Sequence, residues 1–259
     1  ISAFNFPVAV WSWNAAIAWV CGDVTVWKPS SKTPLCAVAC QNIISEVFKK
    51  NGVPEGVSNL IAGNPAGDFI NNDHRIPMVS FTGSTRIGKH VSKTVAERFG
   101  RCILELGGNN AIIVSEHADL SMVLVGAVFG AVGTAGQRCT TTRRLIVNEK
   151  VYDKTISFLK NAYGQLKIGD PLDASNHVGP LIDKNAVKDY LNAIEQAKQE
   201  GGKIAVEGGL LKGDGYESGC YVQPCIIEAD NSFNIVQTET FAPILYVMKY
   251  NDIDDAIAQ

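Results

Sequence analysis

The first eighty residues alternate between short runs of β-branched or aromatic residues and longer amphipathic stretches. The clearest strands are Val24-Thr25-Val26-Trp27 and Met78-Val79-Ser80-Phe81. Strand, helix and strand in this order are typical of βαβ units on a parallel sheet. We therefore expect a nucleotide-binding type of α/β architecture in this part of the chain. An apolar run at residues 8–21 is expected to form a buried helix.

Local signals place two helices in this first part. Residues 33–50 begin with Thr33 as a candidate cap and Pro34 in the first turn, and Asn51-Gly52 follows as a stop. A second helix is expected over residues 85–99, directly after a turn that contains Gly83. A strand, a glycine turn and a helix together form the usual phosphate-binding geometry.

The pattern changes near Gly107-Gly108, where we place a domain boundary. Beyond it the sequence predicts strands at 111–114 and 145–147 and helices at 151–163 and 183–200. The expected organisation is therefore an α/β protein with a nucleotide-binding domain at 1–107 and a second α/β domain at 108–259.

Composition excludes several classes of function. The 259 residues include 46% hydrophobic and 19% charged residues with a net charge of −3, so no basic field favours nucleic acid. The longest apolar run is shorter than the ~20 residues that cross a bilayer. Seven cysteines, an odd number, favour reduced thiols. The four histidines are dispersed and no metal-binding motif occurs, so we expect no metal site.

Two segments at the ends of predicted strands can contact a phosphate or ribose. In one, Gly83 can let backbone amides face a ligand, while Ser84 and Thr85 add hydroxyls at a helix start. A capped turn without a ligand explains the same residues. In the other, Lys28 follows a strand and can hold a ribose or phosphate, although a lysine there can also be merely solvated.

The sharpest chemical feature is Cys139 within Gly133-Thr134-Ala135-Gly136-Gln137-Arg138-Cys139-Thr140-Thr141-Thr142. Most cysteines are buried filler. Here small residues, a cation and hydroxyls surround the thiol, and they favour access to a reactive nucleophile. A covalent catalyst also needs a base, and Glu105, beside Gly107-Gly108, is the best carboxylate candidate.

Six motifs in order resemble the aldehyde dehydrogenase superfamily across the whole chain. They are Phe4-Asn5-Phe6-Pro7, Lys28-Pro29, Phe81-Thr82-Gly83-Ser84-Thr85, Leu104-Glu105-Leu106-Gly107-Gly108, Gly136-Gln137-Arg138-Cys139 and Glu239-Thr240-Phe241-Ala242-Pro243. Within the superfamily, residues 1–7, 105–113 and 134–141 look most similar to enzymes that oxidise α-aminoadipic semialdehyde, an intermediate of lysine catabolism. The resemblance implies a Rossmann-like NAD-binding domain and an α/β catalytic domain, both incomplete.

The resemblance also implies roles for individual residues. Cys139 would attack the aldehyde, Asn5 and the Cys139 N–H would hold the oxyanion, and Glu105 would activate the hydrolytic water. The implied cofactor-binding residues are Lys28, Gly83, Ser84, Glu239 and Phe241. Taken alone, Asn5 can be a turn or cap amide, and Glu239 can be a solvated loop carboxylate.

Cofactor and substrate specificity each depend on one position. Many NAD-preferring relatives carry a glutamate three residues after the lysine, where this chain has Ser31 followed by Lys32. The resemblance favours NAD, and NADP stays open. Arg138, beside the nucleophile, can pair with the carboxylate of a semialdehyde acid, or it can serve in a structural ion pair.

Three hypotheses about function follow. The first is aldehyde oxidation, and the others are a noncatalytic dehydrogenase homologue and a thiol-dependent esterase. The chain opens at Ile1 and closes within a helix-like segment, so we expect an internal fragment with little activity by itself. The family implies dimers or tetramers, a small-molecule aldehyde as partner, and a cytoplasmic or mitochondrial location.

Overall fold

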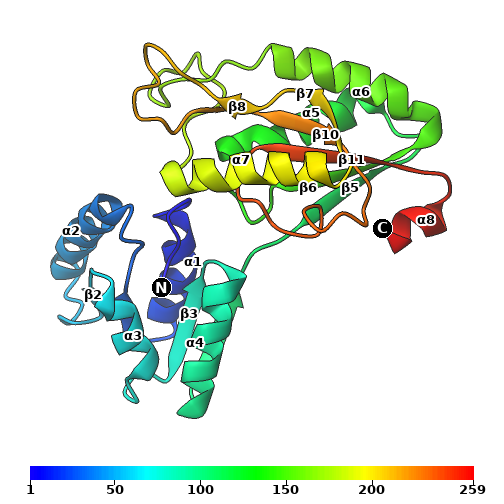
Figure 1. Cartoon of the computed structure of the whole chain (residues 1–259). Coiled ribbons are helices and arrows are strands. Elements are labelled where there is room, and N and C mark those ends of the chain that lie inside the picture. Colours follow the sequence, from blue (N-terminus) through cyan, green and yellow to red (C-terminus); the bar gives the residue numbers. More distant parts are fainter. The chain divides into compact units, whose positions relative to one another are not determined.

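The computed structural model describes all residues 1–259 and divides into two compact units, Ile1–Gly107 and Gly108–Gln259 (Figure 1). Both units combine helices with parallel strands, which confirms the α/β fold class.

The strands of the first unit form parallel pairs. β1 (Thr25–Trp27) pairs with β2 (Ser58–Leu60), and β3 (Met78–Thr82) pairs with β4 (Arg101–Glu105). Residues 1–2 connect the two pairs: the Ser2 N–H donates to the Lys28 carbonyl, and the Thr82 N–H donates to the Ile1 carbonyl, each at 3.1 Å. Residues 1–2 therefore lie between the two strand pairs.

Four helices accompany these strands, namely α1 (Ala9–Val20), α2 (Pro34–Lys50), α3 (Pro65–Asn72) and α4 (Thr85–Glu97). Trp11 of α1 stacks on Trp27 of β1 with ring centroids 4.1 Å apart. A second cluster joins Val79 and Phe81 of β3 to Val91 and Val95 of α4. Aromatic and β-branched residues thus attach the helices to the strands.

Three local predictions in this unit were wrong in detail. The helix at residues 8–21 exists as α1, but Trp13 and Ile17 are 61% and 68% exposed, so it is not a buried helix. Thr33 precedes α2, yet its hydroxyl makes no capping bond, because its backbone (φ −134°, ψ 50°) is not in a capping conformation. α4 stops at Glu97, because Phe99 adopts a left-handed φ of 60°.

The second unit contains a five-stranded sheet in the order β5-β6-β11-β10-β7. β5 (Asn110–Val114), β6 (Thr142–Asn148), β11 (Ile244–Tyr250) and β10 (Cys225–Glu228) are parallel, and β7 (Lys203–Val206) is an antiparallel edge. Its remaining elements are α5 (Leu120–Val132), the 3₁₀ turn η1 (Gly133–Gly136), α6 (Glu149–Gly164), α7 (Lys184–Gln199), β8 (Gly209–Leu210), β9 (Val222–Gln223) and α8 (Ile253–Ala258). The strands and helices expected at 111–114, 145–147, 151–163 and 183–200 are confirmed as β5, β6, α6 and α7.

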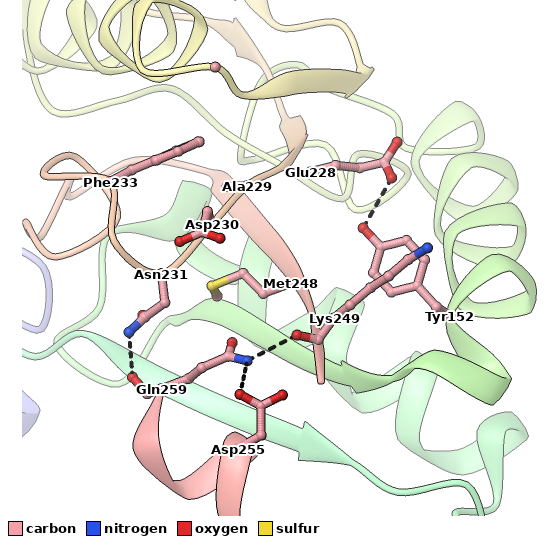
Figure 2. A pocket seen from close by; sticks show the side chains of 11 residues that line it. Tyr152, Glu228, Ala229, Asp230, Asn231, Phe233, Met248, Lys249, Asp255 and Gln259 are labelled. Carbon is pink, nitrogen blue, oxygen red and sulfur yellow. Dashed lines mark hydrogen bonds between the residues drawn. The ribbon is translucent and has the colours of Figure 1, made fainter. Parts of the chain in front are cut away.

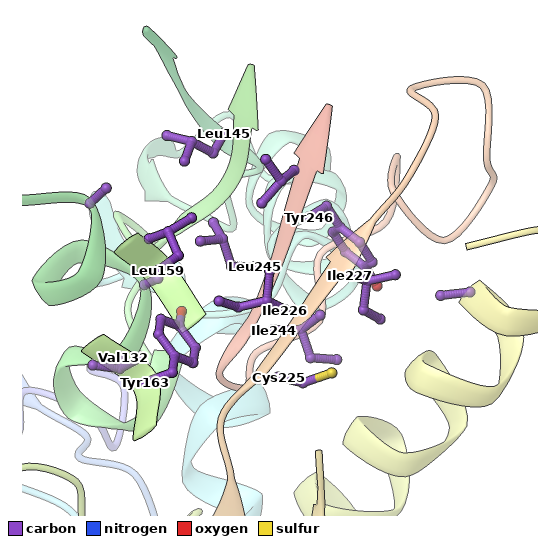
Figure 3. Close-up of a cluster of buried hydrophobic side chains, with 14 of the residues drawn as sticks. Val132, Leu145, Leu159, Tyr163, Cys225, Ile226, Ile227, Ile244, Leu245 and Tyr246 are labelled. Carbon is purple, nitrogen blue, oxygen red and sulfur yellow. The ribbon is translucent and has the colours of Figure 1, made fainter. Parts of the chain in front are cut away.

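The core of this unit lies along its central strands (Figure 3). Leu145, Ile226 and Leu245 are completely buried, and α5 and α6 pack against β6 and β11. A strand covered on both faces is apolar along its length instead of alternating. This rigid layer carries the segments around Cys139 and Glu239, which lie at the starts of β6 and β11.

Candidate active site

In the first unit, the predicted cofactor-binding residues Lys28 and Ser84 and the predicted catalytic residues Glu105 and Asn5 lie at or beyond the carboxyl ends of strands. Lys28 follows β1, Ser84 follows β3 and Glu105 ends β4, while Asn5 lies beyond the strand-like residues 1–2. Lys28 and Asn5 are half-buried, and Ser84 and Glu105 are exposed. Ligands of open parallel sheets bind at this edge, so the arrangement fits a dinucleotide.

The turn before α4 behaves only partly as expected. Ser84 is the N-cap, and its Oγ accepts the Ile87 N–H at 3.4 Å. The Gly83 N–H, however, donates to the Glu105 carbonyl at 3.0 Å, so this amide does not face a ligand. A Cβ on Gly83 would lie 2.6 Å from the Phe81 ring. Gly83 therefore serves close packing between strand and turn, and Ser84 caps the N-terminus of α4, the kind of helix end that can bind an anion.

In the second unit, an unusual left-handed turn precedes Cys139. Thr134, Ala135 and Gly136 have φ values of 55°, 53° and 68°. For the two residues with a Cβ, this conformation costs of order 1–3 kcal/mol each. A Cβ on Gly136 would lie 2.4 Å from the backbone of Ala242. The turn is thus pressed against the segment that leads into β11.

Side-chain amides fix the chain on both sides of this turn. Gln137 is buried and donates to the carbonyls of Thr134 and Pro180, each at 3.3 Å, while its Oε1 accepts the Ile182 N–H at 2.9 Å. Asn110 donates to the carbonyls of Cys139 at 2.6 Å and of Thr141 at 3.0 Å. Strain of this kind persists where the surroundings determine the backbone from several directions.

The Cys139 thiol is exposed at the end of this turn. Its carbonyl is occupied by Asn110, whereas its N–H donates to no backbone acceptor. A free N–H beside a nucleophile is the donor that an oxyanion hole needs. Cys225 shows the contrast, because burial raises the pKa of its thiol to about 12. Cys139 therefore has the access and the neighbouring donor that covalent catalysis requires.

Arg143 is a residue of this site that sequence reasoning missed. It lies on β6 with 2% of its side chain exposed, and it donates to the carbonyls of Gly108 at 3.1 Å, Gly136 at 3.3 Å and Arg138 at 2.9 Å. Its Nη2 also lies 2.8 Å from Oε1 of Glu239. The only sequence signal was a pair of arginines at the start of an apolar strand.

Glu239 and Phe241 lie in the segment before β11. Glu239 is 24% exposed, and its Oε1 accepts both Arg143 and the Gly108 N–H at 3.2 Å. The Phe241 ring centroid lies 5.5 Å from the Arg143 guanidinium carbon. Both hydrogen bonds use one carboxylate oxygen, so Oε2 can accept a ligand hydroxyl. Glu239 is therefore not simply a solvated carboxylate. Its two structural hydrogen bonds use one oxygen and leave the other available.

Arg138 is directed along the end of α5. Its Nε donates to Thr134 Oγ1 at 2.8 Å, and its guanidinium carbon lies 5.3 Å from the Phe129 ring centroid. The Phe129 side chain is 63% exposed. The guanidinium thus lies beside an exposed aromatic ring. Arg138 directly precedes Cys139 in the chain.

One pocket of the second unit has a volume of about 530 Å³ and contains none of the predicted site residues. Figure 2 shows its lining, which includes Tyr152, Glu228, Met248, Lys249 and Gln259.

No cluster of three metal-ligating side chains occurs in the chain. None of its helices combines the length and apolar character that a bilayer crossing requires.

Comparison with known proteins agrees with this geometry. Residues 1–259 match the profile of the Aldehyde dehydrogenase family. The chain is 48% identical to α-aminoadipic semialdehyde dehydrogenase of Bos taurus and 49% identical to a putative aldehyde dehydrogenase family 7 member A1 homologue of Caenorhabditis elegans. Both matches cover 100% of this chain and 48% and 49% of those proteins. The chain thus spans about half the length of these relatives, as the family resemblance implied.

Solved structures give the same assignment. Betaine aldehyde dehydrogenase of Staphylococcus aureus in complex with NAD⁺ superposes with a TM-score of 0.92 at 32% identity, over 98% of this chain and 50% of that one. Glyceraldehyde-3-phosphate dehydrogenase of Methanocaldococcus jannaschii complexed with NADP superposes with a TM-score of 0.90 at 36% identity, over 98% of this chain and 54% of that one. On its sequence, its fold and the segment around Cys139, this chain belongs to the aldehyde dehydrogenase family.

Proposed function

We propose that this chain carries the nucleophile and the main cofactor contacts of an NAD-dependent enzyme that oxidises a semialdehyde to a carboxylic acid. The observation that carries the proposal is the presentation of Cys139: an exposed thiol, with an unengaged N–H, at the end of a strained turn. Similarity to α-aminoadipic semialdehyde dehydrogenase suggests a substrate with a carboxylate distant from the aldehyde.

The family resemblance implies the chemistry at Cys139. The Cys139 thiol gives up its proton to solvent and its sulfur adds to the aldehyde carbon, and the resulting oxyanion would accept hydrogen bonds from the Cys139 N–H and the Asn5 amide. When bound, the dinucleotide supplies an acceptor for the hydride that leaves this carbon, so that a thioester remains on the sulfur. Glu105 then takes a proton from water, which attacks the thioester carbon and releases the acid and the thiol.

The family resemblance implies which residues would hold the dinucleotide. Lys28 would contact the adenosine ribose and Ser84 the pyrophosphate, at the carboxyl edge of the first sheet. Glu239 would bind the nicotinamide ribose through Oε2, because Oε1 is already engaged, and Phe241 would pack near the nicotinamide. Ser31, which is exposed, carries no charge to repel a 2′-phosphate, so the preference for NAD over NADP rests on the resemblance.

The direct test is turnover by the full-length protein, followed as NADH formation with α-aminoadipic semialdehyde. Cys139→Ala is expected to abolish it. Cys36→Ser is a matched control, because Cys36 is also exposed but lies on α2. Full turnover by Cys139→Ala would overturn the proposal. Ester hydrolysis at Cys139 with no NADH formation from any aldehyde would instead identify a thiol esterase, and neither reaction would identify a noncatalytic homologue.

A further inference from the structure

Arg143 is the only charged side chain in this chain that is buried, with 2% exposed. Burying a guanidinium is costly unless hydrogen bonds and an opposite charge compensate it. Arg143 has both, in three backbone carbonyls and the Glu239 carboxylate. An apolar side chain of similar volume commonly serves stability as well as a buried ion pair, so a purely structural role does not explain the choice of arginine.

The carbonyls that Arg143 binds belong to the segment that presents Cys139. One is that of Gly136, the last residue of the left-handed turn, and one is that of Arg138, which directly precedes the thiol. The third is that of Gly108, before β5. The planar fork of a guanidinium holds several acceptors in a fixed geometry, which a lysine ammonium does not.

Glu239 is joined to the same network through its Oε1. That oxygen accepts Arg143 Nη2 at 2.8 Å and the Gly108 N–H at 3.2 Å. The segment after Glu239 also packs directly on the turn, since a Cβ on Gly136 would lie 2.4 Å from Ala242. A shift of the Glu239 carboxylate therefore acts on Arg143 and, through it, on the backbone at Gly136 and Arg138.

We propose that Arg143 is a positioning residue that couples the Glu239 carboxylate to the backbone conformation that presents Cys139. A ligand hydroxyl bound at Oε2 of Glu239 would shift the same carboxylate. Ligand binding there would therefore change how the backbone presents the Cys139 thiol. The ligand part of this inference rests on the proposed function, in which the ligand is the nicotinamide ribose. The coupling itself requires no cofactor.

A cofactor-free experiment tests the coupling in the full-length protein. Iodoacetamide alkylation is followed by peptide mass spectrometry, and the rate at Cys139 is divided by the rate at exposed Cys36, the internal standard. Arg143→Met and Glu239→Gln are each expected to change this ratio by about fivefold or more, within the range for residues of one network. The double variant is expected to match Arg143→Met within about twofold, because the effect of Glu239 passes through Arg143.

Matched variants separate positioning from general damage. Arg144→Met removes the neighbouring arginine, whose Nε donates to the Asn109 carbonyl at 3.1 Å, and should leave the ratio unchanged. Arg143→Lys keeps a cation for Glu239 but lacks the fork, so it should shift the ratio while the protein stays folded. If Arg143→Met does not fold, the same cycle is run with Arg143→Lys.

Two results would overturn the coupling: an unchanged ratio in a folded Arg143 variant, or effects of Arg143 and Glu239 that multiply independently. The ligand arm adds saturating NAD, which should alter the ratio in the wild-type protein and not in Arg143→Met; equal responses in both would overturn transmission. A wild-type protein that binds neither NAD nor NADP would overturn the proposed function, while the cofactor-free cycle would still decide the role of Arg143.

Discussion

The Nδ2 atom of Asn110 lies 2.6 Å from the carbonyl oxygen of Cys139 and 3.0 Å from that of Thr141. One side chain at the start of β5 thus holds the backbone on the C-terminal side of the nucleophile. With the Cys139 carbonyl turned toward Asn110, the Cys139 N–H is left available for an oxyanion.

Asn110→Ala is therefore expected to reduce aldehyde-dependent kcat/KM by about ten- to a hundredfold, since small displacements of reacting groups have effects of this size. Thermal stability should change little, because Asn110 is exposed. Asn176→Ala is a control: Asn176 is half-buried and also donates to a backbone carbonyl, that of Asp170, at 3.1 Å. Steady-state kinetics of both variants check this, and a kcat/KM for Asn110→Ala within twofold of wild type would contradict it.

Gly136→Ala tests the left-handed turn. The residue has φ +68°, and a Cβ would lie 2.4 Å from Ala242 and 2.6 Å from Pro243 backbone atoms, which cannot yield as a flexible side chain would. We expect a loss of about 2–4 kcal/mol in the free energy of unfolding, from strain and overpacking. Gly126→Ala on α5 is the control, because nothing lies within 4 Å of its Cβ position and alanine favours a helix by about 1 kcal/mol. Urea unfolding of both variants makes the comparison, and equal stabilities would refute the turn argument.

The parts of the fold that the sequence predicted correctly carry local signals. Pro34 and Asn51-Gly52 mark the ends of α2, and Gly52 indeed adopts a positive φ of 68°. α6 and α7 have clear amphipathic patterns and acidic or amide caps at Asn148 and Asp183. These signals depend on residues within one or two turns, so no tertiary information is needed to read them.

The parts that were missed depend on distant or contradictory information. α5 is apolar around its whole circumference and contains two glycines, so it shows no helical periodicity. Thr134 and Ala135 adopt a left-handed backbone conformation that both residue types disfavour. The role of Arg143 depends on Gly108 and Glu239, which are 35 and 96 residues away along the chain. A pair of arginines in a sequence indicates solvated side chains unless such partners are known.

Alkaline pH should destabilise the second unit through Cys225. Burial raises the pKa of its thiol to about 12 from an ordinary 9.0. Between these values the unfolded chain releases the proton and the folded chain keeps it, so stability is intact below pH 9 and falls as pH rises. One such group contributes a slope of up to about 1.4 kcal/mol per pH unit. Buried Tyr163 and Tyr190, whose pKa values burial also raises, add to the loss above pH 10.

Urea midpoints at pH 8 and pH 10.5 check this slope. Cys225→Ala should be less stable at pH 8, because it leaves a small cavity, but should lose less stability between the two pH values than wild type. Cys139→Ala is the control, since Cys139 is exposed and its removal should not alter the slope. Identical slopes for all three proteins would show that Cys225 does not carry the effect.

Ser31→Glu should increase the preference for NAD over NADP. A glutamate at this exposed position, three residues after Lys28, would accept the ribose 2′-hydroxyl of NAD and repel the 2′-phosphate of NADP. We expect the ratio of kcat/KM for NADP to that for NAD to fall at least about tenfold. Ser31→Gln has the same size without the charge and should change the ratio much less. Equal effects of the two variants would mean that position 31 does not contact the 2′ group.

Arg138 should determine how strongly the enzyme prefers a substrate that carries a carboxylate. Its Nε donates to Thr134 and its guanidinium lies near the exposed Phe129 ring at the end of α5, so its orientation is restrained before a substrate arrives. Arg138→Ala should lower kcat/KM for α-aminoadipic semialdehyde about ten- to a hundredfold more than for hexanal, the range that one charge-assisted hydrogen bond to a carboxylate supplies. Arg138→Lys should recover part of the difference, since it keeps the charge but not the bidentate geometry. A structural ion pair would instead lower kcat/KM for both aldehydes by the same factor, and that result would remove Arg138 from the substrate site.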